Sequence, residues 1–179
     1  MKLDRGRAAL AVIDVQEAFR PAVLDFERVA ANVGVLVQGA RILGLPVLVT
    51  EQYPKGLGVT VPEVARHLGD VPRLEKTSFS ALAADGFPAA LDDERDQVVL
   101  CGIEAHVCVN QTAEDLLAAG REVHLVGDAV TSRTAENRAL GIHKMERSGA
   151  VLTSVETALF ELLREAGTPE FKEIQRLVK

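Results

Sequence analysis

The sequence has two cysteines, four histidines and no tryptophan among its 179 residues. Two cysteines cannot build a disulfide framework, and no cysteine–histidine cluster has zinc-finger spacing. Long hydrophobic runs are also missing, because the longest apolar stretches are strand length and well short of a membrane span. Residues 1–7 run straight into a strand without a separate apolar signal segment. We therefore expect a soluble cytoplasmic protein with reduced thiols and no membrane partner.

Positive charge is scarce, and no segment is rich in lysine or arginine. The formal net charge is -6, which argues against a nucleic-acid partner. Hydrophobic residues make up 47% of the chain, close to the globular average. No G-x-G-x-x-G motif follows the first strand, which disfavours a dinucleotide cofactor, and we expect no cofactor at all. The length suits one domain spanning 1–179.

Buried-strand patterns alternate with amphipathic helical patterns along the chain. Strands are predicted at 8–13, 46–50, 73–76, 98–101, 122–126 and 150–152. Helices are predicted at 26–43, 62–67, 87–91, 108–119, 136–148, 156–165 and from 168 onward. This alternation predicts a three-layer α/β/α, Rossmann-like fold with a mainly parallel six-stranded sheet. The apolar stripe of the last helix predicts packing on the core or on a second subunit.

Cys108 lies at the most informative junction, where the strand ending at Gly102 gives way to a helix. The first-turn N–H groups of a helix are unpaired and its dipole favours an anion, so this place lowers a thiol pKa and activates a nucleophile. The alternative is a small buried hydrophobe, the commoner fate of a free cysteine. Cys101 lies within the strand and is interpreted as core.

Asp14 and Lys76 are predicted at the same rim of the sheet, each at the carboxyl end of a strand. Open parallel sheets bind ligands at that rim. Alternatively, Asp14 caps a turn and Lys76 is a solvated surface residue. His106 is interpreted as peripheral. Asp128 is expected to brace the turn after the fifth strand through Thr131 or Ser132.

Three motifs taken together resemble the isochorismatase-like cysteine hydrolases, the superfamily that includes nicotinamidases. They are VIDVQ at 12–16, EKTSFS at 75–80 and GIEAHVCV at 102–109. Each motif alone is weak, but their order on a strand–helix frame is specific, and the similarity covers nearly the whole chain. The segments EQYPKGLG at 51–58 and EFKEIQ at 170–175 resemble the isochorismatase domain-containing proteins, a subgroup whose pattern defines no substrate.

The resemblance implies a catalytic triad of Asp14, Lys76 and Cys108. In that scheme Cys108 is the nucleophile, Lys76 stabilises its thiolate, and Asp14 carries the thiol proton to a leaving amine. The resemblance also implies an oxyanion hole made by the main-chain N–H groups of Glu104 and Cys108. A cis peptide bond between Ile103 and Glu104 would aim these groups.

Substrate contacts are expected from five residues at the same rim: Phe19, Gln52, Tyr53, Phe79 and Ile103. Nicotinamidases typically hold a metal through an Asp-x-His pair after the second strand. This chain departs from that pattern with EQY at 51–53, so we expect no metal. The departure makes a metal-held pyridine substrate doubtful.

We expect a hydrolase that cleaves a carbon–nitrogen bond of a small amide-like substrate through an acyl-enzyme. The alternative from another class is a non-catalytic small-molecule-binding or thiol redox-responsive protein on the same fold. Isochorismate hydrolysis is disfavoured, since the enzymes that perform it lack the cysteine nucleophile. Members of the superfamily commonly assemble, so a homo-oligomer is expected.

Overall fold

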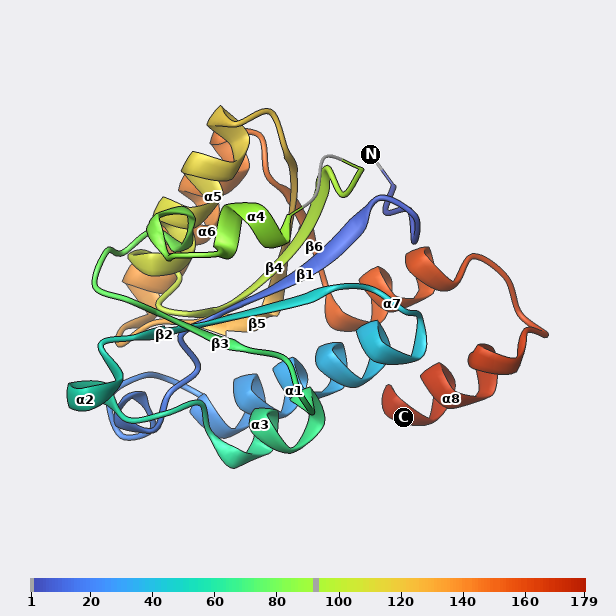
Figure 1. Ribbon diagram of the computed structural model, residues 1–179, viewed down its shortest axis with the longest axis horizontal. Helices are drawn as coiled ribbons and strands as arrows, with labels where there is room; N and C mark the ends of the chain where they lie inside the picture. The colour runs from blue at the N-terminus through green and yellow to red at the C-terminus, as the bar shows by residue number, and fades with distance from the viewer. Residues whose placement is uncertain (1, 92–93) are drawn as a thin grey trace.

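Six strands form one sheet in the order β3-β2-β1-β4-β5-β6 in the computed structural model, which describes residues 2–91 and 94–179 (Figure 1). Every pairing between neighbouring strands is parallel. The strands are β1 (Ala8–Ile13), β2 (Val47–Gln52), β3 (Arg73–Lys76), β4 (Gln97–Ile103), β5 (Glu122–Thr131) and β6 (Val151–Thr153). The predicted α/β class and the parallel six-stranded sheet are confirmed.

Helices cover both faces of the sheet (Figure 1). One face carries α1 (Phe26–Ile42), α3 (Pro62–Leu68), α7 (Val155–Leu163) and α8 (Pro169–Leu177). The other carries α4 (Phe87–Ala90), α5 (Cys108–Ala118) and α6 (Ala135–Ser148). Short helical segments η1 (Glu17–Phe19), α2 (Pro54–Leu57) and η2 (Ala81–Ala83) complete the connections. No helix in the described part of the chain is long and apolar enough to cross a membrane.

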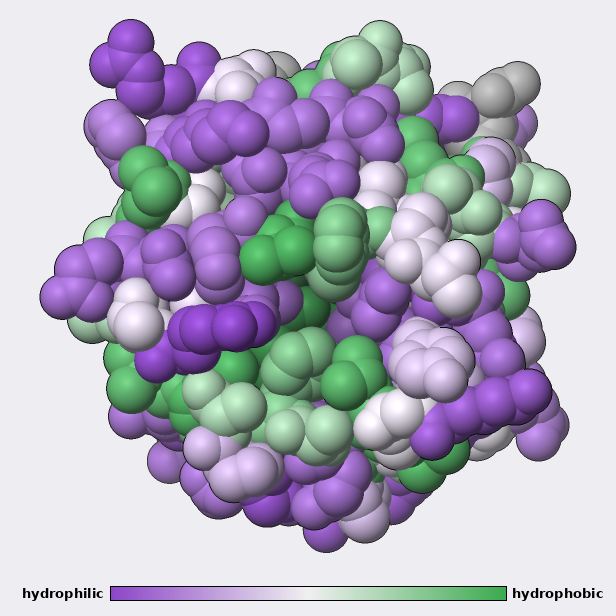
Figure 2. Space-filling model, turned by 90° about the vertical axis from the view of Figure 1, so that its left-hand side faces the viewer, coloured by the Kyte–Doolittle hydropathy of each residue, from purple (hydrophilic) through white to green (hydrophobic). Residues whose placement is uncertain are grey.

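The carboxyl ends of the strands lie together at the left of Figure 1, beside α2, and this face is turned toward the viewer in Figure 2. Hydrophobic residues gather across the middle of this face, with hydrophilic residues around them (Figure 2). Exposed apolar side chains in segments that follow the strand ends include Leu24, Tyr53, Val59 and Phe79. This face is the rim at which the sequence predicted the reactive residues.

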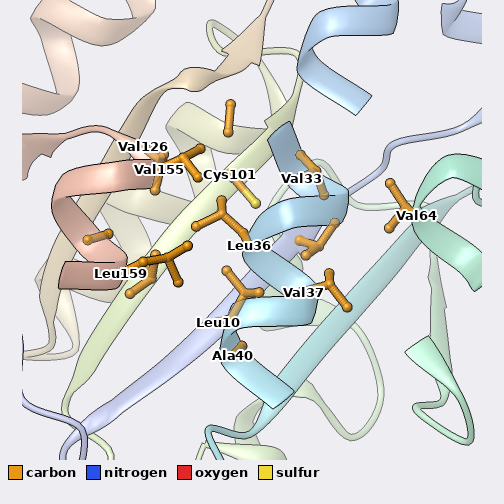
Figure 3. Packing of buried hydrophobic residues seen from close by; sticks show 14 of the residues in the cluster. Leu10, Val33, Leu36, Val37, Ala40, Val64, Cys101, Val126, Val155 and Leu159 are labelled. Atoms are coloured by element: carbon orange, nitrogen blue, oxygen red, sulfur yellow. The ribbon is translucent and has the colours of Figure 1, made fainter. Parts of the chain in front are cut away.

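The sheet buries apolar side chains on both faces, as continuous strand runs predict. On the α1 side, Leu10, Leu36 and Leu159 pack together with Cys101 (Figure 3). The opposite side holds a second cluster that includes Leu100, Leu116 and Met145. The two clusters fix the sheet between its helical layers and therefore fix where its carboxyl ends lie.

Three strands run at least two residues further than their sequence patterns suggested. β4, predicted at 98–101, continues to Ile103. β2 continues to Gln52, and α2 forms between the strand predicted at 46–50 and the helix predicted at 62–67. β5 was predicted to end at Val126 but continues to Thr131. A register irregularity against β4, between Leu100 and Gly102, accommodates this extension. Gly127 and Asp128, which resemble a strand end in the sequence, instead form a local irregularity within β5.

The terminal helix packs on its own chain. Ile174 is fully buried in the α1-side cluster, and Phe171, Leu177 and Val178 pack against that cluster. Of the two destinations expected for this apolar stripe, the structure shows the core.

Candidate active site

Asp14 follows β1 and turns inward at the rim. Its backbone adopts the left-handed conformation with φ 51°, which aspartate tolerates better than most residues. The side chain is fully buried, and its two carboxylate oxygens have different partners. Oδ1 accepts a hydrogen bond from Thr50 Oγ1 at 2.7 Å, and Oδ2 accepts one from Lys76 Nζ at 2.7 Å. The buried carboxylate is therefore both oriented and paired.

Lys76 ends β3 and extends its ammonium into the same site. Besides Asp14 Oδ2, the Nζ atom donates to Gln52 Oε1 at 2.6 Å and to the carbonyl oxygens of Ser78 at 3.2 Å and Phe79 at 3.1 Å. Neither the Lys76 nor the Asp14 side chain has exposed surface. A charge without solvent needs such partners. The lysine predicted at the rim is thus part of a buried ion pair and is not a solvated surface residue.

Cys108 is the first residue of α5 and is only 5% exposed. As the first residue of a helix, it has a main-chain N–H with no acceptor inside that helix. Its thiol interacts with the side chains of both Asp14 and Lys76. The structure therefore brings together three residues that lie far apart in the sequence.

The protonation state of Cys108 differs from the sequence prediction. Burial and the Asp14 charge raise the pKa of the thiol to about 12, although the Lys76 ammonium lowers it. The expectation of a depressed pKa at this helix terminus was therefore wrong. A thiolate here would give the buried site two negative charges against one positive charge. The Cys108 thiol is consequently protonated at neutral pH.

The turn between β4 and α5 is closely packed. The peptide bond between Ile103 and Glu104 is cis, as the resemblance led us to expect. The N–H groups of Val107 and Val109 both donate to the Glu104 carbonyl oxygen. A Cβ on Gly141 would lie 2.7 Å from the Ala105 carbonyl, so only glycine lets α6 approach the turn this closely. The neighbouring helix thereby holds in place the chain that leads into Cys108.

Glu104 is buried and forms a two-point ion pair with Arg133. Arg133 Nη2 donates to Oε1 at 2.6 Å and Nε to Oε2 at 3.1 Å, and the Arg133 main-chain N–H donates to Oε2 at 2.9 Å. Burial alone would raise the pKa of Glu104, but these Arg133 contacts outweigh it and lower the pKa. The charged pair ties the turn to the end of β5.

The five residues expected to contact a substrate lie in different environments. Tyr53 and Phe79 are about half exposed, whereas Phe19 is partly buried against the α1-side cluster. Ile103 is fully buried within that cluster, which leaves its side chain no exposed surface for a substrate. Gln52 already uses both ends of its amide inside the protein, through Lys76 and the Thr77 carbonyl oxygen.

A cavity of about 470 Å³ lies beside the edge strand β3. Tyr53, Lys55, Glu75 and Asp85 contribute to its lining, but Asp14 and Cys108 do not. It also touches Lys76, whose side chain has no exposed surface, so it meets that residue at the main chain. The cavity therefore adjoins Lys76 but does not surround the side chains of Asp14 and Cys108.

The last two residues of β2, Glu51 and Gln52, do not fit a metal. Glu51 Oε1 accepts hydrogen bonds from the main-chain N–H and the hydroxyl of Thr60, each at 2.7 Å. The Gln52 oxygen is engaged by Lys76. Among residues 2–91 and 94–179, no three histidine, cysteine, aspartate or glutamate side chains are grouped so that they could hold a metal ion.

Three other sequence interpretations have clear outcomes. Cys101 is fully buried in the core, as expected. His106 Nδ1 lies 3.0 Å from Ser132 Oγ, at the side of the turn. Asp128 does not brace its own turn, because its Oδ1 accepts a hydrogen bond from the main-chain N–H of Val155 at 2.9 Å. It thus satisfies the start of α7, a contact that local sequence does not reveal.

Sequence reasoning missed two supporting residues, Gln16 and Arg133. Gln16 is fully buried and bonds to the main chain of Gln52. A polar residue two positions after Asp14, next to a buried strand, was the available signal. Arg133 had no comparable signal, since its partner Glu104 lies 29 residues earlier in the chain.

A model of the isochorismatase domain matches residues 8–157 of the chain. The chain belongs to the isochorismatase family. Isochorismatase domain-containing protein 2 of Danio rerio is 44% identical over 179 residues, covering 99% of this chain and 89% of the relative. The secreted isochorismatase effector Isc1 of Phytophthora sojae is 43% identical over 177 residues, covering 96% of this chain and 84% of the relative.

Solved structures of family proteins have the same fold. The MAR1 ribonuclease of Caenorhabditis elegans matches with a TM-score of 0.95 and 41% identity, covering 99% of this chain and 92% of that chain. The YcaC gene product of Escherichia coli, described as an octameric hydrolase of unknown specificity, matches with a TM-score of 0.86 and 25% identity. That match covers 92% of this chain and 83% of the YcaC chain.

Proposed function

We propose that this isochorismatase-family protein is a cysteine hydrolase that cleaves a carbon–nitrogen bond of a small amide-like molecule. The observation that carries the proposal is the buried constellation of Asp14, Lys76 and Cys108. A thiol, a carboxylate able to take its proton and a fixed cation are the groups that thiol-based acyl transfer requires. The neutral thiol does not weaken the proposal, because Asp14 lies beside it as proton acceptor.

Acylation begins when the Cys108 proton moves to Asp14 and Sγ attacks the substrate carbonyl carbon. The carbonyl electron pair moves to oxygen, and the main-chain N–H groups of Glu104 and Cys108 donate to that oxyanion. The oxyanion re-forms the carbonyl, the carbon–nitrogen bond breaks, and Asp14 returns the proton to the leaving nitrogen. The products of this half-reaction are a free amine and a Cys108 thioester.

Deacylation uses one water molecule. Asp14 takes a proton from the water as its oxygen attacks the thioester carbonyl carbon, and the same N–H groups hold the second oxyanion. The carbon–sulfur bond then breaks, the acid leaves, and Asp14 returns the proton to Cys108 sulfur. Through both steps Lys76 keeps its charge and offsets the negative charge that moves between Asp14, sulfur and oxyanion. Net, one amide and one water give one acid and one amine.

The rim residues support a small substrate with an apolar part. Phe19, Tyr53 and Phe79 are the proposed contacts, since they come from segments that follow strand ends and two of them are half exposed. Gln52 is not among them, because its amide is engaged inside the protein. Ile103 is not a proposed contact either, because its side chain is buried in the core.

Exposed apolar residues on this face, such as Leu24 and Val59, also favour a homo-oligomer. The octameric E. coli relative supports self-association, and sedimentation tests it. The proposed location is the cytoplasm, because both cysteines are free. One relative is named a secreted effector.

The test is intact-mass analysis after brief incubation with a pool of small amides, ureides and carbamates. We expect an acyl adduct on the wild type and none on the Cys108→Ala variant, whose melting temperature shows that it is folded. Adducts or turnover that survive Cys108→Ala contradict the mechanism. RNA and isochorismate serve as additional substrates in the same assay. RNA is included because a similar structure is named a ribonuclease, although a net charge of -6 disfavours a polyanion.

Redox sensing is less well supported than hydrolysis. Thiol oxidation proceeds through the thiolate, and burial holds the Cys108 pKa at about 12. A sensor also has no use for a buried Asp14–Lys76 pair. Rapid loss of the thiol to peroxide, without hydrolysis of any member of the pool, would favour sensing.

A further inference from the structure

The side-chain amide of Gln16 hydrogen-bonds to the main chain of Gln52 in the way that a neighbouring strand would. Its Nε2 donates to the carbonyl oxygens of Gln52 at 3.0 Å and Gly58 at 2.6 Å, and its Oε1 accepts from the Gln52 main-chain N–H at 2.7 Å. An amide that exchanges both bonds with one residue's main chain does what a neighbouring strand does. β1 ends at Ile13, whereas β2 runs to Gln52. The Gln16 amide therefore fixes β2 beyond the end of its partner strand.

The side chain of Gln52, whose main chain Gln16 holds, in turn contacts Thr77 and Lys76. Its Nε2 donates to the Thr77 carbonyl oxygen at 2.8 Å, and its Oε1 accepts from Lys76 Nζ at 2.6 Å. A carbonyl oxygen only accepts hydrogen bonds, so the amide nitrogen must face Thr77 and the amide oxygen must face Lys76. The orientation of the Gln52 amide is thus set from both ends.

The Gln52 oxygen matters most when Asp14 is protonated. At that moment Lys76 loses its carboxylate partner, and its charge remains without solvent. The oxygens of Gln52, Ser78 and Phe79 then hold the ammonium. Among these three, the Gln52 contact is the shortest and the only one from a side chain. It is therefore the contact that a substitution can remove.

We propose that Gln16 and Gln52 are positioning residues that act in series on Lys76. Gln16 fixes the main chain of Gln52, and the Gln52 side chain holds the ammonium in place while the proton passes between Cys108 and Asp14. The inference rests on the proposed function. It gives Gln52 a role inside the protein in place of the substrate contact that the sequence suggested.

The test measures the rate at which iodoacetamide alkylates Cys108, followed by intact mass, and it needs no knowledge of the substrate. Gln52→Met keeps the side-chain length and removes the acceptor, and we expect alkylation at neutral pH to slow by about tenfold. Gln16→Met should slow it by a smaller factor. The matched control is Gln38→Met in α1, where Nε2 donates to Gly34 within the same helix, and its rate should equal that of the wild type.

Two further variants separate positioning from general loosening of the fold. If the glutamines act in series, the Gln16→Met/Gln52→Met double variant is no slower than Gln52→Met alone. Gln52→Glu keeps an acceptor but places a second carboxylate at one ammonium, so the acid side of the rate profile should move to higher pH. A purely structural role would lower the melting temperature and leave the shape of the profile unchanged.

Lys76→Met shows which proposal fails. If Lys76→Met leaves the alkylation rate and its pH profile unchanged, the proposed triad itself is contradicted. If Lys76→Met slows alkylation but Gln52→Met behaves like Gln38→Met, only the positioning inference is overturned. Additive effects of the Gln16 and Gln52 substitutions would overturn their action in series.

Discussion

The two cysteines of this chain lie seven residues apart and have opposite surroundings. Cys101 is within β4, fully buried, with its Sγ 3.6 Å from the Ala11 carbonyl oxygen. Cys108 begins α5 and meets the side chains of Asp14 and Lys76. Burial raises the pKa of both thiols, so pKa alone does not separate them. What distinguishes Cys108 is a neighbouring carboxylate that can take its proton and a fixed cation that offsets the charge.

In the proposed mechanism, the buried Cys108 thiol serves as the nucleophile without being a thiolate at rest. Transfer of a proton from Cys108 to Asp14 leaves the net charge of the site unchanged, so the burial cost of an extra charge is avoided. Cys101 has no such acceptor beside it, and its ionisation would place an uncompensated charge in the core.

A large effect on turnover is expected from removing the proton acceptor that Cys108 has and Cys101 lacks. Asp14→Asn keeps the shape of the side chain but cannot take the thiol proton. Hydrolysis of the substrate found in the pool assay should fall by about 10²–10⁴-fold, the range typical of a lost general base. Steady-state turnover measures it, with circular dichroism as the control for folding. Turnover within a few-fold of the wild type would contradict the assigned role of Asp14.

The next effect concerns Gly102, which lies between the two cysteines. Its φ is 124°, and a Cβ there would lie 2.0 Å from the Ile13 carbonyl oxygen. Gly102→Ala should therefore lower the free energy of unfolding by about 3–5 kcal/mol, through backbone strain and overpacking together. Urea denaturation measures it. The control is Gly120→Ala, where φ is 79° and nothing lies within 4 Å of the added carbon, so only the strain remains.

Replacing Cys101 by alanine should mainly lower stability, whereas replacing Cys108 by alanine should mainly lower turnover. Cys101→Ala leaves a small cavity in the core and should lower the free energy of unfolding by about 1–2 kcal/mol, with turnover unchanged. Cys108→Ala should abolish turnover at a smaller cost in stability, because its thiol is at the rim. Unfolding curves and the pool assay on both variants test the pair. A loss of turnover in Cys101→Ala that exceeds its loss of folded protein would break the distinction.

The last expected effect is a gradual loss of stability at alkaline pH. Both thiols have folded-state pKa values above their ordinary value of 9.0, so their contribution is complete below that pH and declines above it. For Cys108 the decline runs from about pH 9 to about pH 12. Each thiol should remove about 1.4 kcal/mol per pH unit within its window. Urea midpoints should therefore fall less steeply above pH 9 in Cys101→Ala than in the wild type; identical slopes would contradict this.

Much of the fold was predictable because its signals are local. The apolar run at 98–101 and the helical pattern after Cys108 indicated a buried strand and its helix correctly. The extension of β5 to Thr131 was missed because Gly127 and Asp128 resemble a strand end, whereas only pairing with β4 shows that the strand continues.

The site was less predictable, because its electrostatics depend on residues that fold together from distant segments. The helix terminus at Cys108 suggested a lowered thiol pKa, but Asp14, 94 residues earlier, brings a negative charge that local sequence does not show. Gln52 was placed at the rim correctly, yet its hydrogen bonds to Lys76 and Thr77 appear only in three dimensions. Sequence indicated which residue types gather, and the structure shows their partners.

The pH dependence of Cys108 alkylation is the sharpest test of the proposed proton transfer from Cys108 to Asp14. Internal transfer changes no net charge, so the wild-type rate with iodoacetamide should be flat between about pH 6 and pH 9. In Asp14→Asn the proton must leave to solvent, so the rate should rise about tenfold per pH unit until the thiol is titrated. A tenfold rise in rate per pH unit in both proteins would contradict proton transfer from Cys108 to Asp14.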